Sequence, residues 1–268
     1  MKMSNTEKNK TILSVKNITK RYRGKTNNGK DTIAVDSVSF DMLRGETIGL
    51  VGESGCGKST LAKILVKLIS SDSGSIIFDG MDITHLPEKH FRKIRRNIQL
   101  ISQNPLATLD PRMRIIDSLS EGVLYNNILD SKSKIKPYLE DLMEVCELSS
   151  DHFNRYPSQM SVGQLQRVSI VRALSLKPKL IIADEIVSAL DVSVQGQIID
   201  LLQKLKEKYR LSMIFISHDL AVIRSSVDTI FVMRNGSFVD FGTVSHIFNE
   251  SRCPYTMELL AAIPEFQF

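Results

Sequence analysis

The chain has 268 residues, of which 42% are hydrophobic and 24% charged, with a formal net charge of +5. These values exclude a disordered chain and fit a folded globular protein. No run of about 18 apolar residues occurs, so no segment is expected to span a bilayer, and no signal peptide is predicted. The three cysteines (Cys56, Cys146 and Cys253) are far apart, which argues for a reducing compartment and against disulfides.

The first part of the chain predicts strands. Residues 1–10 are polar and lysine-rich and are expected to form a flexible tail. Ile12–Ile18 and Thr32–Phe40 alternate apolar and polar residues, which predicts partly exposed antiparallel strands. Thr47–Val51 is a short apolar strand that runs into a glycine-rich turn and then a helix. Ser75–Phe78 and the turn after it predict a further hairpin.

The middle of the chain changes character. Apolar residues recur at helical spacing there, so a mostly helical insertion is expected over about 86–175. Its basic stretch at 89–96 is expected to be the solvated face of a helix. Strands then return at Leu180–Ala183 and Met213–Ile216, with an amphipathic helix over Ile198–Tyr209 between them. A hairpin around Asn235–Gly236 opens the C-terminal part, 228–268.

A phosphate-binding loop lies between the first buried strand and its helix. It fits the pattern G-x-x-x-x-G-K-S/T and consists of Gly52, Glu53, Ser54, Gly55, Cys56, Gly57, Lys58, Ser59 and Thr60. Glycines let backbone N–H groups point inward at phosphate oxygens, and the helix presents its positive end to the same anion. Lys58 would contact the β- and γ-phosphates, and Ser59 would give a hydroxyl to Mg²⁺. Cys56 is expected to contribute backbone only.

Two carboxylates end the next buried strand, Leu180–Ala183. Asp184 can hold Mg²⁺, and Glu185 can act as general base on the attacking water. The fold expected is therefore an α/β P-loop NTPase core over 11–268. It has a largely parallel sheet, an N-terminal antiparallel β subdomain and an inserted helical subdomain.

Three further elements carry a family resemblance. Met160–Gln164 precedes an apolar helix, Ser188–Asp191 follows the acidic pair, and His218 ends a strand. In this order, the chain resembles the nucleotide-binding domain of an ATP-binding cassette (ABC) protein. The resemblance covers essentially everything after the tail.

The resemblance implies roles for matching residues. Tyr22 would stack on adenine, and Gln103 would sense Mg²⁺ and the water and link the site to pore subunits. His218 would contact the γ-phosphate. Ser161, Gly163 and Gln164 would touch ATP held by the opposite subunit, and Asp191 would cross the dimer interface. ATP and Mg²⁺ are the cofactors implied.

Val162 stands where the family signature has glycine. A branched side chain restricts the backbone approach that glycine allows, so the composite site that uses this signature is hypothesised to be weakened. The alternative is that this lineage tolerates valine.

Three segments resemble the oligopeptide, dipeptide and nickel importer branch: Gln103–Met113, Glu185–Gln195 and Cys253–Pro264. In that branch, two different ATPases pair beneath two membrane permeases, with an extracytoplasmic binding protein. The chain resembles the shorter, F-type ATPase, which implies a peripheral location at the cytoplasmic face of the membrane. Only Cys253 lies near the C-terminus, so no iron–sulfur cluster is expected, and no nucleic acid partner is predicted.

Alternatives remain open from the sequence. The ATPase does not touch the cargo, so a nickel or metal-chelate importer fits as well as a peptide importer. A non-transport ABC ATPase is a more distant alternative, because the insertion lacks sustained heptads.

Overall fold

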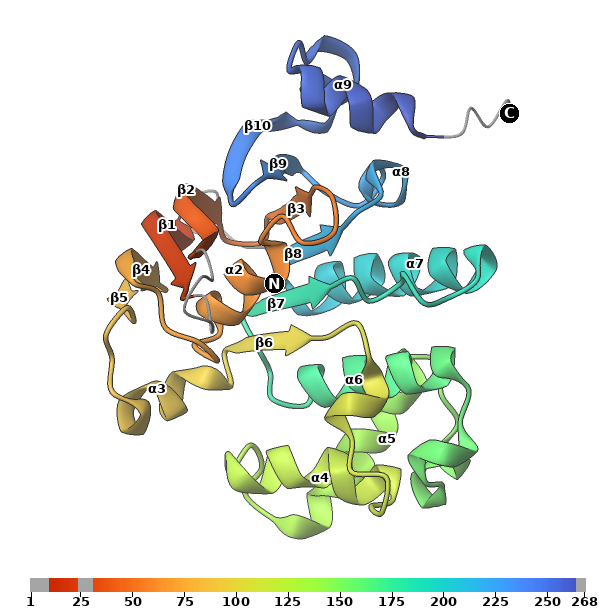
Figure 1. The fold of residues 1–268 in the computed structure, drawn as a ribbon. Helices are drawn as coiled ribbons and strands as arrows, with labels where there is room; N and C mark the ends of the chain where they lie inside the picture. The colour runs from red at the N-terminus through yellow and green to blue at the C-terminus, as the bar shows by residue number, and fades with distance from the viewer. Residues whose placement is uncertain (1–9, 24–30, 264–268) are drawn as a thin grey trace. The chain divides into compact units, whose positions relative to one another are not determined.

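The computed structural model describes residues 10–23 and 31–263. Most of the expected tail at 1–10 and the last residue of the Cys253–Pro264 motif lie outside this range. The chain divides into two compact units, one of Met1–Arg92 with Leu211–Phe268 and one of Lys93–Arg210. Figure 1 labels the helices and strands of both.

The first unit contains a four-stranded antiparallel sheet in the order β2-β1-β4-β5. Its strands are β1 (Thr11–Tyr22), β2 (Thr32–Leu43), β4 (Ser73–Phe78) and β5 (Met81–Asp82). Buried and exposed residues alternate along β2, as expected for a sheet with one face on the core. The predicted N-terminal antiparallel strands are confirmed, and β1 extends four residues past Ile18 because it pairs with β2 as far as Tyr22.

The same unit holds a second set of strands, in the order β10-β9-β3-β8. They are β3 (Thr47–Val51), β8 (Ser212–Ser217), β9 (Thr229–Arg234) and β10 (Ser237–Thr243). β3 pairs in parallel with both β8 and β9, and β10 closes the hairpin on β9. Every residue of β3 and β8 is buried, which explains why both read as continuous apolar runs.

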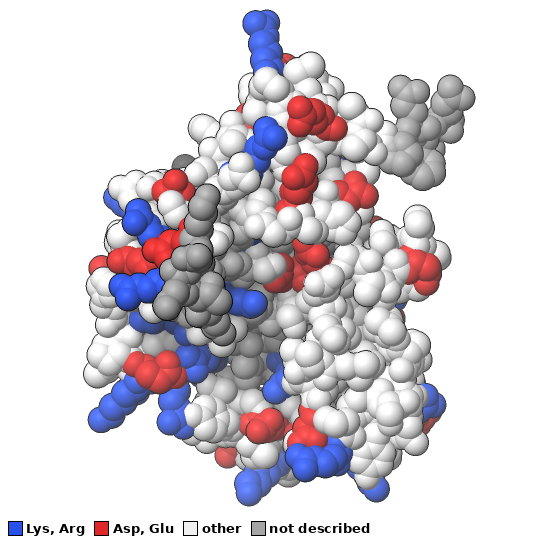
Figure 2. Space-filling model, viewed as in Figure 1, with Lys and Arg blue, Asp and Glu red and all other residues white. Residues whose placement is uncertain are grey.

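Helices of the first unit follow these strands. They are α2 (Lys58–Leu65) after β3, α8 (Leu220–Ile223) after β8, the π-helix η5 (His246–Glu250) and α9 (Pro254–Ala261). α3 (Glu88–Arg95) carries the basic stretch, and all of its residues are exposed or half-buried except Phe91. Charges of both signs are interspersed over the face drawn in Figure 2.

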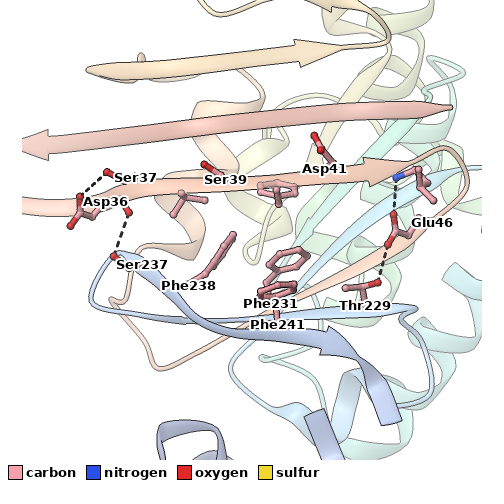
Figure 3. Close-up of a pocket in the computed structure, with 13 residues that line it drawn as sticks. Asp36, Ser37, Ser39, Asp41, Glu46, Thr229, Phe231, Ser237, Phe238 and Phe241 are labelled. Carbon is pink, nitrogen blue, oxygen red and sulfur yellow. Dashed lines mark hydrogen bonds between the residues drawn. The ribbon is translucent and has the colours of Figure 1, made fainter. Parts of the chain in front are cut away.

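A groove of about 760 Å³ opens between β2 and the β9–β10 hairpin (Figure 3). Four phenylalanines line it: the ring centroids of Phe40 and Phe231 are 5.5 Å apart, and Phe238 and Phe241 lie 4.9 and 5.8 Å from Phe231. Phe241 is 66% exposed. This aromatic cluster joins the edge of the antiparallel sheet to the hairpin.

The second unit pairs two parallel strands, β6 (Ile98–Ile101) and β7 (Leu180–Asp184). Its four longer helices are α4 (Ile115–Tyr125), α5 (Ile135–Val145), α6 (Val162–Leu174) and α7 (Val192–Tyr209). Short 3-10 helices precede the first three of them: η1 (Pro105–Thr108) before α4, η2 (Lys132–Lys134) before α5, and η3 (Ser150–Asn154) and η4 (Pro157–Gln159) before α6. α7 begins at Val192, six residues before the predicted Ile198.

The region expected to be mostly helical holds α3, α4, α5 and α6, and it also holds strand β6. The bounds predicted for the insertion and for the C-terminal part stay predictions. No helix in the described ranges is long and apolar enough to cross a membrane.

Candidate functional site

The loop after β3 depends on glycine. Gly52 has φ 155° and Gly57 has φ 115°, and a Cβ at either position would lie 2.1 Å from a backbone oxygen. For Gly52 that oxygen belongs to Met233, and for Gly57 it belongs to Ala34. Backbone atoms of β9 and β2 therefore lie so close to the loop that larger residues do not fit at these two positions.

Lys58 is buried in this loop, with 3% of its surface exposed. Its Nζ donates to the carbonyl oxygens of Gly52 (2.6 Å) and Glu53 (2.9 Å), so the ammonium lies inside the turn. The N-terminus of α2 carries no side-chain cap and no acid in its first turn. A curled backbone, an enclosed ammonium and a positive helix end together suit a phosphate group.

Cys56 lies in the same loop and is buried. Burial raises the pKa of its thiol, although nearby Lys58 acts in the opposite direction. The Cys56 carbonyl accepts a hydrogen bond from Gly236 N–H at 2.9 Å. The residue thus contributes a neutral thiol and a backbone contact that ties the loop to the β9–β10 turn.

His218 follows β8 and is exposed. Ser217, the last residue of β8, is in register with Val51, the last residue of β3. The carboxyl ends of parallel strands meet at one edge of a sheet, so His218 and the phosphate loop leave the sheet at the same edge. The structure brings these two predicted site elements together.

Tyr22 ends β1 and is 45% exposed. The Lys20 ammonium lies 5.8 Å from the centroid of its ring. The ring is accessible for stacking on a planar group, but its contact with adenine stays a prediction.

Asp184 ends β7 in the second unit, and Glu185 follows it. Asp184 is 7% exposed, at the carboxyl end of a strand that is buried throughout. Glu185 has φ 49°, a left-handed conformation that a non-glycine residue rarely adopts. Its carbonyl accepts hydrogen bonds from Ser188 N–H (3.2 Å) and Ser188 Oγ (2.9 Å). Ser188 therefore closes the turn that holds Glu185 in this strained conformation.

Gln103 follows β6, the parallel neighbour of β7. Its Nε2 donates to Ser188 Oγ at 3.1 Å. Ser188 thus joins Gln103 to the backbone of Glu185, and this role was missed from the sequence. The only available signal was the position of Ser188 three residues after Glu185, where a hydroxyl can bond back to a turn.

The signature residues form the N-terminus of α6. Ser161 caps the helix: its Oγ accepts from Gln164 N–H (3.2 Å), and Gln164 Oε1 accepts from Ser161 N–H (3.0 Å). A Cβ on Gly163 would lie 3.1 Å from Val194 Cγ1. Val162 occupies the first helical position and is 46% exposed. The capping box fixes the direction of the helix start, with Val162 at the surface.

Asp191 caps α7 in the same way. Its side chain accepts from Val194 N–H at 3.0 Å, and it is exposed. This cap explains why α7 begins earlier than the sequence predicted, because the cap starts the helix before its apolar stripe begins. The predicted residues Gln103, Glu185, Ser161 and Asp191 therefore lie at strand or helix ends of one unit.

Comparisons with known proteins identify the family. The ABC transporter family matches residues 35–188. The oligopeptide transport ATP-binding protein OppF of Streptococcus mutans is 41% identical over 97% of this chain and 84% of its own length. The dipeptide transport ATP-binding protein DppF of Lactococcus lactis is 39% identical, over 95% of this chain and 82% of its own.

Among solved structures, the dimeric ATP-binding cassette MJ0796, in a post-hydrolysis state with ADP and Pi, superimposes with a TM-score of 0.78. The two chains are 27% identical, over 87% of this chain and 98% of MJ0796. The chain therefore belongs to the ABC transporter family, as an ATP-binding and ATP-hydrolysing subunit, and it is similar to subunits of oligopeptide and dipeptide transporters.

Proposed function

We propose that this chain is the F-type ATPase of a peptide importer. It would work at the cytoplasmic face of the membrane with a second ATPase, two permeases and an extracytoplasmic binding protein. The observation that carries the proposal is a glycine-shaped phosphate loop with an enclosed Lys58, in a chain that aligns over nearly its whole length with two peptide-transport subunits.

Nucleotide binding is assigned to the loop Gly52–Thr60. Its backbone N–H groups and the start of α2 would hold the phosphate oxygens, and Lys58 would supply the compensating charge. Tyr22, 45% exposed at the end of β1, would hold the base by stacking.

Mg²⁺ binding is assigned to Ser59, Gln103 and Asp184. Hydroxyl, amide and carboxylate oxygens are the ligands that this hard cation prefers, so each of the three side chains is of a suitable type. When bound, the ion would neutralise negative charge on the phosphates. Asp184 is buried at the carboxyl end of β7, and its carboxylate is a ligand of the type that this ion prefers.

Glu185 is proposed as the general base. It would take a proton from the water whose oxygen attacks the γ-phosphorus, while the bond from that phosphorus to the bridging oxygen of ADP breaks. The turn closed by Ser188 fixes the backbone from which the Glu185 carboxylate projects. Gln103, bonded to Ser188, would orient the water, and His218 would contact the γ-phosphate.

Completion of the site is assigned to a partner. Ser161, Gly163 and Gln164 begin α6, and Asp191 begins α7, so these two helix ends can face an anion from outside the chain. The dimeric state described for MJ0796 supports a pair of cassettes, which we propose to be arranged head to tail. Val162 is exposed at that helix start, where its branched side chain would hinder the approach of the partner's nucleotide.

A cargo-stimulated ATPase assay tests which cargo the complex imports. The assembled complex is placed in proteoliposomes, and ATPase activity is measured with the binding protein loaded with oligopeptide, dipeptide, Ni²⁺ or a nickel chelate. Stimulation by peptide alone is expected, and the complex with Glu185→Gln is the matched control for background hydrolysis. Stimulation by nickel alone would replace the peptide assignment. Copurification with ribosomes or DNA in place of membrane subunits would overturn the transport role.

A further inference from the structure

The C-terminal Pro-Tyr-Thr segment matched a family motif in the sequence, yet the ATPase mechanism gives it no role. α9 (Figure 1) begins with it, at Pro254, and only Tyr255 and Thr256 of this helix are buried. Tyr255 is 2% exposed, whereas Met257 beside these two residues is 54% exposed. The buried surface of this helix is thus concentrated in two polar residues of the motif.

Tyr255 contacts the phosphate loop directly. Its hydroxyl oxygen accepts a hydrogen bond from the backbone N–H of Glu53 at 3.1 Å. That N–H belongs to the same peptide group as the Gly52 carbonyl, which accepts from Lys58 Nζ at 2.6 Å. One peptide plane at the entrance of the loop is therefore held from both sides, by Tyr255 on its donor and by Lys58 on its acceptor.

The orientation of this peptide matters because Gly52 packs closely against the backbone of β9. Its φ of 155° comes with a contact so close that an added Cβ would lie 2.1 Å from Met233 O. A rotation of the peptide would turn the Gly52 carbonyl away from Lys58 and displace the ammonium that the loop encloses. The Tyr255–Glu53 hydrogen bond is part-buried, and such a bond is worth roughly a several-fold change in an equilibrium constant.

Neighbouring residues hold the Tyr255 ring in place. The Arg234 guanidinium lies 4.5 Å from the ring centroid, in cation–π geometry. Asp240 Oδ2 accepts hydrogen bonds from Thr256 Oγ1 (2.7 Å) and from Ser251 Oγ, which fixes the start of α9 on β10. The Tyr255 hydroxyl is neutral at physiological pH, because its ordinary pKa of 10.0 already lies above that pH and burial raises the pKa further.

We infer that Tyr255 is a positioning residue of the phosphate loop, and that α9 sets the nucleotide affinity of this chain through the Tyr255–Glu53 hydrogen bond. Each residue of the segment then has a distinct role. Pro254 starts the helix, Tyr255 reaches the loop, and Thr256 fastens the helix to Asp240. The inference rests on the ATP site assigned above and is independent of the cargo.

Tyr255→Phe tests it, because phenylalanine keeps the ring against Arg234 and removes only the hydroxyl. Affinities for MgADP, pyrophosphate and adenosine are measured by isothermal titration calorimetry on the full chain. We expect MgADP and pyrophosphate to bind about 3- to 10-fold more weakly, with adenosine unchanged. Tyr209→Phe, at the end of α7, is the matched control and should leave all three affinities as in the wild type.

Thr256 gives a second test with a conservative rescue. Thr256→Val removes the bond to Asp240 and should weaken MgADP binding about 2- to 3-fold, whereas Thr256→Ser should restore it. A merely structural role would lower the melting temperature of both Tyr255→Phe and Thr256→Val without changing the affinity of the folded protein for phosphate ligands.

The possible outcomes lead to different conclusions. If wild-type chain binds no nucleotide, the ATP site assignment fails, and not this inference alone. If wild type binds and Tyr255→Phe binds MgADP equally well, or loses adenosine binding to the same extent, the inference is overturned. If Tyr255→Phe does not fold, hydrogen exchange of wild type decides: a slowly exchanging Glu53 amide supports the bond, and a fast one refutes it.

Discussion

Gly57→Ala is the sharpest test of how the phosphate loop is shaped. The substitution places a methyl group on a residue with φ 115°, where it would lie 2.1 Å from Ala34 O and 2.8 Å from Met233 Cε. The Met233 side chain can move, but Ala34 O belongs to the backbone of β2 and is held there by the sheet. Either the loop or the strand must therefore shift.

The expected cost has two parts. A left-handed conformation costs a non-glycine residue about 1–2 kcal/mol, and overpacking adds about 1–3 kcal/mol, so a loss of roughly 2–5 kcal/mol is expected. Gly45→Ala isolates the conformational cost from the overpacking cost, because Gly45 has φ 78° and nothing lies within 4 Å of its added Cβ. Gly45→Ala should cost only about 1 kcal/mol, after the entropic gain from restricting the unfolded chain.

Urea unfolding measures the stability of both variants, and MgADP titration measures the nucleotide affinity of the loop. Gly57→Ala should unfold at clearly lower urea with an unchanged slope, and it should bind MgADP at least about 10-fold more weakly. Gly45→Ala should bind normally. If Gly57→Ala is no less stable than Gly45→Ala, the close contact with Ala34 does not shape the loop and the reasoning is wrong.

Three residues of the second unit give further predictions. Glu185→Gln should lower phosphate release by the assembled complex about 100-fold or more while MgATP still binds, because an amide cannot take the proton. Val162→Gly should raise ATP turnover in the complex, and an unchanged rate would show that the valine is tolerated. Cys146 is fully buried, and burial raises the pKa of its thiol to about 12 from 9.0. Above pH 9 the unfolded thiol loses its proton while the folded one keeps it, so stability should fall by about 1.4 kcal/mol per pH unit. Urea unfolding at pH 8 and 10 should show this extra loss in wild type and not in Cys146→Val.

The strands of this fold could be predicted because their burial follows a simple period. Thr47–Val51 was bounded correctly, since a strand covered on both faces is a short apolar run between turn signals. β6 was not predicted: four residues, Ile98–Ile101, carry too little pattern to separate strand from helix. The start of α7 was placed late because its first residues, such as Val192 at 81% exposure, face solvent and add nothing to the apolar stripe.

The candidate site residues were easier to predict from the sequence than their supports, meaning the residues that hold them in place by hydrogen bonds. Lys58 and Glu185 belong to local patterns whose chemistry is readable from residue type and spacing. The link from Gln103 to Ser188 spans 85 residues, and that from Glu53 to Tyr255 spans 202. Neither partner carries a chemical signature of its own, because a hydroxyl becomes a support only when folding places it beside a backbone group.

The two supports, Tyr255 and Ser188, each hold a backbone group of the candidate site in place. Gly52 has φ 155°, which glycine adopts readily, and Glu185 has φ 49°, which a non-glycine residue rarely adopts, and a hydrogen bond fixes the peptide group beside each. In each case the bonding partner is a hydroxyl: Tyr255, from α9, for the Gly52–Glu53 peptide, and Ser188, three residues along the chain, for Glu185. A hydroxyl suits this role well, since it bonds a peptide group without adding charge beside phosphate. The site's geometry is thus maintained by residues that need not touch the nucleotide, and changes at these positions should alter affinity or rate while the phosphate-loop sequence itself stays intact.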